Sequence, residues 1–176
     1  MWPILFGCLV PTAVIAYTDY KRHWVPNVIT IPMFLTGIAY AVYQDNVADA
    51  LAGAGVAFLI GFVCFAIGGM GGGDVKFLAG LGAWFGLSGV FPVILLGCLI
   101  GVCWGLGKLV KAGRLREWAA DLFRGLFLRF VLNVQGAASV SKLPDDIAAP
   151  IPREAVPFGT CLALAAWAVW ALATFS

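Results

Sequence analysis

Long apolar segments that carry almost no charge dominate this sequence and constrain its fold more than any other feature. Of the 176 residues, 62% are hydrophobic and only 11% are charged, whereas a soluble domain carries about 25% charged residues. A large core cannot account for that deficit. The apolar runs are continuous, whereas strands of a membrane barrel alternate apolar and polar residues. The sequence therefore predicts an all-α polytopic membrane protein, with a single domain over residues 1–176.

Breaks between the apolar runs divide the chain into six predicted transmembrane helices. These helices cover residues 2–18, 26–43, 47–68, 75–87, 92–109 and 156–175. In residues 111–134, apolar side chains recur at helical spacing opposite charged ones, which predicts an amphipathic helix on the cytoplasmic side. Residues 135–155 contain three prolines and are expected to form a flexible loop. The amphipathic helix and the loop, about 111–155, are an insertion before the last helix.

Local features refine this outline. Pro11 is expected to kink the first helix, and Ser88 with Gly89 to turn the chain between the fourth and fifth helices. The five cysteines all lie in apolar segments and form no CxxC pair. They are interpreted as buried structural thiols rather than as disulfides or zinc ligands. Neither a metal ion nor a cofactor is expected.

The basic residues are sorted to one side of the predicted helices. All eleven lysines and arginines fall in loops or helix ends on that side, which the positive-inside rule makes cytoplasmic. The sequence thus predicts a multi-pass protein of the inner (cytoplasmic) membrane with both termini outside. A net charge of only +2 does not indicate a nucleic acid partner. The lipid bilayer is the expected partner, and the oligomeric state stays open.

Two acidic residues, Asp19 and Asp74, each stand at the cytoplasmic end of an apolar helix. The other seven acids fall in an outer turn, on the amphipathic face or in the loop. Asp74 directly follows the glycine-rich stretch 68–73. An ionisable residue at a membrane segment indicates a functional site, although Asp19 alone could be a solvated flanking residue and Asp74 alone a helix N-cap. His23 is interpreted as an interfacial side chain. Lys76 is expected either to pair with lipid phosphate, which is favoured, or to tune Asp74.

A pair of carboxylates can do chemistry that neither residue does alone. Held a few ångströms apart, two carboxylates share one proton. The ionised member takes a proton from water while the neutral member polarises a peptide carbonyl, so a peptide bond is hydrolysed without a serine or cysteine nucleophile. We hypothesise that Asp19 and Asp74 form such a pair facing the cytoplasm. Glycine backbone beside them would leave room for an extended peptide.

Three motifs resemble those of the type IV prepilin peptidases. Gly71-Gly72-Gly73-Asp74 matches the GxGD motif of intramembrane aspartyl proteases, and Val75-Lys76 extends it as in the prepilin peptidases. Asp19 followed by Pro26-Asn27 resembles the family's first aspartate and its downstream Ile-Pro-Asn, with Val25 in the isoleucine place. Pro157-Phe158-Gly159 resembles the Pro-Phe-Gly that opens the family's final segment. The three matches occur in the family's order.

This resemblance implies a membrane-embedded aspartic endopeptidase that removes the short basic leader of prepilin-like proteins at the cytoplasmic face. Cleavage would follow a glycine that precedes the substrate's hydrophobic helix. The resemblance makes Asp19 and Asp74 catalytic. It also implies a set of residues that bind substrate or shape the loop, namely Gly71, Gly73, Lys76, Pro26 and Asn27. Because the chain has no CxxC pair, it resembles the small peptidase-only branch, as in tight-adherence (Flp) pilus or archaeal preflagellin peptidases, and methylation is not expected.

Alternative functions would use the same residues differently. A protease of the presenilin or signal-peptide-peptidase kind would place both aspartates within the hydrophobic thickness on adjacent helices. A small transporter or channel would bind an ion at Asp74, with the glycines forming a broken helix. That reading would be supported by internal repeats, and the two halves of the sequence show none. A purely structural membrane subunit would leave the motif matches as coincidence.

Overall fold

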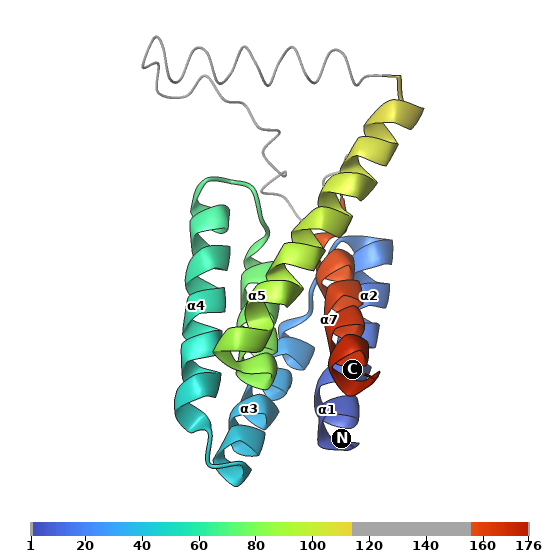
Figure 1. Cartoon of the computed structure of the whole chain (residues 1–176). Helices are drawn as coiled ribbons and strands as arrows, with labels where there is room; N and C mark the ends of the chain where they lie inside the picture. The colour runs from blue at the N-terminus through green and yellow to red at the C-terminus, as the bar shows by residue number, and fades with distance from the viewer. Residues whose placement is uncertain (1, 114–155, 176) are drawn as a thin grey trace. The chain divides into compact units, whose positions relative to one another are not determined.

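Helices joined by short loops make up the part of the chain that the computed structural model describes, residues 2–113 and 156–175. Its elements are α1 (Trp2–Ile4), the π-helix η1 (Leu5–Leu9), α2 (Val10–Arg22), α3 (Asn27–Tyr43), α4 (Val47–Ala66), α5 (Gly72–Lys111) and α7 (Phe158–Phe175) (Figure 1). The predicted all-α class is confirmed for these residues. The amphipathic helix predicted at 111–134 lies outside the described residues from residue 114 on. The loop predicted at 135–155 lies outside them entirely.

Several of these helices suit a membrane. Among the described residues, three helical stretches are long and apolar enough to cross one, namely Trp2–Arg22, Val47–Ala66 and Gly72–Lys111. Shorter apolar helices cover Asn27–Tyr43 and Phe158–Thr174. Apolar helices of this length support the membrane class that was predicted from composition. The count of six crossings stays a prediction.

The chain separates into two compact units, residues 1–101 with 157–176, and residues 102–156. In the first unit, α2 and α7 pack side by side. They run antiparallel, because Thr160 at the start of α7 bonds to Asp19 and Trp167 further along bonds to Thr12. Both ends of the chain lie at the same end of this unit (Figure 1). In the second unit, the described part is mainly the last turns of α5. The single-domain organisation stays a prediction.

A buried apolar cluster joins the helices of the first unit. Ile15 of α2, Met33 of α3, Leu81 of α5 and Leu162 of α7 are all buried within it. Between helices in a membrane, close packing of such side chains stabilises the contacts through van der Waals interactions. Many of the other large apolar side chains are exposed, as lipid-facing surfaces require. This cluster fixes α2, α5 and α7 relative to one another, and these are the helices that carry the candidate site.

Helix α5 is broken at Gly86, where the chain reverses direction (Figure 1). Gly86 has φ 66° and ψ −175°, a conformation that glycine adopts without strain. A Cβ at this position would collide with the Asp49 carboxylate, whose Oδ1 accepts the Leu87 N–H at 3.2 Å. The turn predicted at Ser88 and Gly89 was therefore placed too late. Asp49, attributed to an outer turn, lies in the first turn of α4 and caps the second half of α5.

Two smaller predictions, the kink at Pro11 and the burial of the cysteines, have different outcomes. The irregular π-helix η1 ends just before Pro11, consistent with the expected disturbance of this helix by proline. Burial of the cysteines is confirmed only for Cys8 and Cys161. Cys98 and Cys103 are exposed and Cys64 is half-buried, so for these three the prediction was wrong. A thiol is apolar enough to face lipid chains as well as a protein core.

Candidate active site

Asp19 lies in the last turn of α2 and is only 4% exposed. The helix ends at His23, whose backbone adopts a left-handed conformation with φ 48° and whose N–H donates to the Asp19 carbonyl at 2.8 Å. His23 therefore terminates the helix through its backbone, as residues in this conformation commonly do. The buried position of Asp19 requires hydrogen-bond donors for its carboxylate, because a buried charge without partners is strongly unfavourable.

Those donors come from the first turn of α7. The first N–H groups of a helix have no partner within the helix, and the Thr160 N–H donates to Asp19 Oδ2 at 2.8 Å. Gly159 lies directly against the same carboxyl group, since a Cβ built on it would be 3.1 Å from Asp19 Oδ2. The Thr160 hydroxyl lies 3.0 Å from the Ala16 carbonyl oxygen and 3.2 Å from Asp19 Oδ2. The positive end of the α7 dipole thus faces Asp19, which favours a negative charge there.

Asp74 lies in the first turn of α5. Its N–H donates to the Gly71 carbonyl at 3.1 Å. Gly71 also lies against the Asp74 carboxyl group, since a Cβ built on Gly71 would be 3.3 Å from Asp74 Oδ2. Oδ1 of Asp74 is buried and has no hydrogen-bond partner among the described residues. Oδ2 of Asp74 therefore lies against the loop at Gly71, whereas Oδ1 is left without a partner among the described residues.

Gly159 brings the two carboxylates together. A Cβ built on Gly159 would lie 3.1 Å from Asp19 Oδ2 and 3.1 Å from Asp74 Oδ1. The two oxygens are therefore no further apart than twice that distance. Both carboxyl groups thus lie close to the same backbone position, and paired acid–base chemistry needs two carboxyl groups held near each other. Any side chain at position 159 would occupy that space.

Gly71 and Gly73, predicted to shape the loop, both lie in close contacts. A Cβ on Gly73 would come within 2.9 Å of the Val25 Cβ, and a Cβ on Gly71 within 3.3 Å of Asp74 Oδ2. Gly73 thus lets the start of α5 approach the segment that leads into α3, while Gly71 lies directly against the Asp74 carboxylate. Both glycines hold Asp74 in place through packing. Their contacts within the described residues do not test the predicted role in binding substrate.

Pro26, Asn27 and Lys76 form a neighbouring group rather than part of the carboxylate pair. Pro26 is the N-cap residue of α3, and its carbonyl accepts the N–H groups of Ile29 and Thr30 at 3.1 and 3.2 Å. The Lys76 ammonium donates to Asn27 Oδ1 at 3.0 Å. These contacts join the start of α3 to the start of α5. They support both helices at the end of the unit where Asp74 lies.

Sequence reasoning missed Thr160. Its N–H and its hydroxyl both contact Asp19, although 141 residues separate the two along the chain. The available signal was its place in the first turn of the last helix, directly after Pro157-Phe158-Gly159, where backbone N–H groups need an acceptor. Within residues 2–113 and 156–175, no group of three or more His, Cys, Asp or Glu side chains is placed to hold a metal ion.

Comparison with known proteins identifies the family of the chain. The model of the type IV leader peptidase family matches residues 5–106, which include both aspartates. The chain belongs to this family. It is 29% identical over 163 residues to the prepilin leader peptidase/N-methyltransferase of Xanthomonas campestris pv. campestris, covering 86% of this chain and 44% of that protein. The resemblance inferred from the three motifs is thus confirmed at the level of the family.

Further relatives match over shorter stretches. Leader peptidase HopD of Escherichia coli is 36% identical over 94 residues, covering 46% of this chain and 57% of that protein. The prepilin leader peptidase/N-methyltransferase of Aeromonas salmonicida is 30% identical over 120 residues, covering 62% of this chain and 41% of its own length. The chain spans less than half the length of the Xanthomonas and Aeromonas relatives. No solved structure matches it significantly.

Proposed function

We propose that this chain is a membrane-embedded aspartic endopeptidase that removes the leader peptide of prepilin-like proteins, with Asp19 and Asp74 as its catalytic pair. The observation that carries the proposal is the placement of both carboxylates around Gly159, where a Cβ would lie 3.1 Å from each. Membership of the leader peptidase family adds the substrate class, because its named relatives are prepilin leader peptidases. A prepilin-like protein is then the macromolecular partner.

The contacts of the two carboxyl groups suggest how they divide the work. Asp19 accepts hydrogen bonds at the amino end of α7, which stabilise its ionised form. Among the described residues, Asp74 has fewer donors and its Oδ1 has no hydrogen-bond partner, so it is the better place for the shared proton. In the proposed reaction Asp19 takes a proton from water as the water oxygen attacks the peptide carbonyl carbon. Asp74 gives its proton to the carbonyl oxygen.

Breakdown of the tetrahedral intermediate completes the reaction. The proton that Asp19 took from water passes to the leaving amine as the carbon–nitrogen bond breaks. Asp74 recovers a proton from the intermediate's hydroxyl group as the new carboxylic acid forms. Both residues return to their starting states, and the reaction consumes one water molecule. General acid and base catalysis of this kind contributes on the order of 10²–10⁴-fold to a rate.

The proposed orientation places this site at the cytoplasmic face of the inner membrane. The chain would cross the membrane six times, with α2 and α7 meeting at the cytoplasmic end where Lys21 and Arg22 follow Asp19. Both termini would lie outside. The positive-inside rule keeps the short basic leader of the substrate in the cytoplasm. A site at the cytoplasmic face would be accessible to that leader.

The test is cleavage of a prepilin-like substrate by the purified protein, reconstituted in lipid vesicles, with the products mapped by mass spectrometry. We expect a single cut after the glycine that precedes the substrate's apolar segment. A substrate with that glycine changed to valine serves as the control and should remain intact. Absence of any cut across a panel of prepilin-like substrates, with the protein folded, would contradict the proposal.

A further inference from the structure

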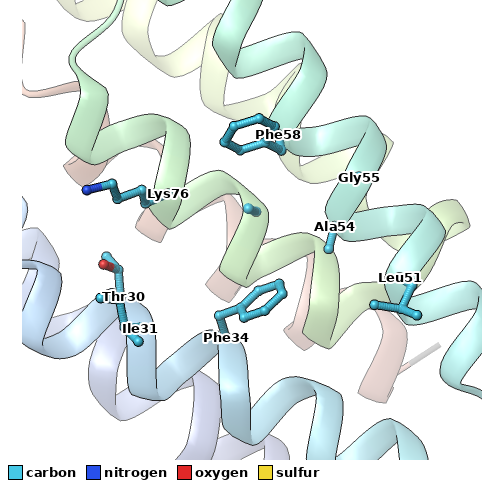
Figure 2. A pocket seen from close by; sticks show the side chains of 9 residues that line it. Thr30, Ile31, Phe34, Leu51, Ala54, Gly55, Phe58 and Lys76 are labelled. Atoms are coloured by element: carbon cyan, nitrogen blue, oxygen red, sulfur yellow. The ribbon is translucent and has the colours of Figure 1, made fainter.

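A cavity of about 420 Å³ lies between α3, α4 and α5. Figure 2 shows Phe34, Leu51 and Phe58 along its apolar walls, Gly55 on the α4 side, and Lys76 at one end. Phe58 and Leu51 are seven residues apart on α4, so the apolar part extends roughly 10 Å along the helix, at 1.5 Å per residue. Neither Asp19 nor Asp74 belongs to its lining. The cavity is therefore separate from the candidate active site.

One cation lies at the end of this cavity. Among the lining residues in the described chain, Lys76 alone carries a charge. Its ammonium donates one hydrogen bond, to Asn27 Oδ1 at 3.0 Å, and an ammonium has three donors. Asn27 thus orients the side chain and leaves donors for an anion. The complementary ligand has an apolar chain and a negative charge at one end.

The cavity also faces the surroundings of the helices rather than the core. Ile31 and Leu51 are each 52% exposed, and Phe58 is 45% exposed. In a protein of the membrane class, apolar side chains exposed on a spanning helix meet lipid tails. A peptide with a basic leader would be repelled by Lys76, whereas the phosphate of a lipid would be attracted. The position of Lys76, close to one end of α5, suits a headgroup near the membrane surface.

We propose that this cavity binds one anionic phospholipid. An acyl chain lies along Phe34, Leu51 and Phe58, and the headgroup phosphate accepts hydrogen bonds from Lys76. Because Lys76 follows Asp74 by two residues in α5, the bound lipid supports the end of the helix that carries the candidate catalytic residue. The proposal does not depend on the peptidase activity.

Glycines on the same chain allow a matched pair of variants. An added Cβ at Gly55 meets nothing within 4 Å, and Gly55 lines the cavity, so Gly55→Leu adds a side chain there. Gly107 on α5 has the same open surroundings and does not line the cavity, so Gly107→Leu is the control. For the charge, Lys76→Gln removes the cation from the cavity, and Lys21→Gln removes one elsewhere.

The measurement is lipid binding to the full-length protein in detergent, by native mass spectrometry, with phosphatidylglycerol and phosphatidylcholine as probes. We expect the wild type to bind one phosphatidylglycerol at least tenfold more tightly than phosphatidylcholine. Gly55→Leu should lose this lipid, and Gly107→Leu should keep it. Lys76→Gln should still bind a lipid but with the headgroup preference reduced to about equal, whereas Lys21→Gln should keep the preference.

Two outcomes would overturn the proposal. Binding of phosphatidylglycerol by Gly55→Leu with wild-type affinity would mean that the lipid lies elsewhere. If Gly55→Leu binds lipid as the wild type does and also has a raised KM for a prepilin-like substrate, the cavity binds the peptide instead. A thermal unfolding measurement confirms beforehand that both leucine variants are folded.

Discussion

Asp19 and Asp49 make similar contacts in two regions of the molecule, yet only one of them is placed for chemistry. Each accepts a backbone N–H from the start of another helical segment, Asp19 from Thr160 at 2.8 Å and Asp49 from Leu87 at 3.2 Å. Asp49 packs against the glycine backbone at Gly86. Asp19 lies instead across Gly159 from the second carboxylate, Asp74. A cap of the kind that Asp49 makes stabilises the fold and does no more. Asp19 also has a second carboxylate nearby, which makes proton transfer possible.

The largest expected contrast between the two regions is in cleavage. Asp19→Asn or Asp74→Asn removes the shared proton with little change in shape, and we expect cleavage to fall by about 10³-fold or more. Asp49→Asn keeps an oxygen acceptor for Leu87 and should leave cleavage within about threefold of wild type, since the cap survives. Initial rates on a prepilin-like substrate measure all three. Comparable losses in all three variants would erase the distinction between catalytic and structural aspartates.

Protein stability should show the reverse contrast, with the larger loss for a change in the region of Asp49. Gly86→Ala introduces a Cβ against the Asp49 carboxylate at a residue with φ 66°, and we expect it to destabilise the protein by roughly 3 kcal/mol. Thermal unfolding in detergent is the measurement, with Gly107→Ala as the control because that position is open. A melting temperature for Gly86→Ala equal to that of the control would mean that α5 is not broken there.

Gly159 offers a smaller but more specific effect. Gly159→Ala places a methyl group where it would lie 3.1 Å from both carboxylates, so it excludes a water molecule or carbonyl from the space between them. We expect cleavage to fall about thirtyfold, roughly 2 kcal/mol of transition-state stabilisation, while the melting temperature changes little because alanine favours a helix. Normal turnover by this variant would indicate that the substrate does not enter between the carboxylates.

Thr160 should give the smallest effect. Thr160→Val removes the hydroxyl group and keeps the N–H, so Asp19 loses one of its contacts and we expect kcat to fall about tenfold with KM unchanged, roughly 1.4 kcal/mol. Thr160→Ser retains the hydroxyl group and should restore most of the rate. If Thr160→Ser is as slow as Thr160→Val, the residue acts through packing and does not position Asp19 through its hydroxyl.

Most of the helices could be predicted from apolar runs, because a spanning helix needs a continuous apolar stretch and charges mark its ends. Asp19 and Asp74 could be singled out because charge is rare in such a chain. The position of the break in α5 could not be predicted, since it depends on Asp49 of another helix meeting Gly86. Thr160 was missed for the same reason, because its contact with Asp19 joins residues far apart in the sequence.

The catalytic roles of Asp19 and Asp74 stay a proposal, and one measurement tests their pairing most directly. Single-turnover cleavage by Asp19→Asn, Asp74→Asn and the double variant shows whether the residues act as a unit. If both carboxylates serve one proton-transfer step, the double variant will be no slower than the slower single variant, because residues that act together are not additive. Losses that multiply in the double variant would contradict a shared-proton pair and indicate that the two aspartates act independently.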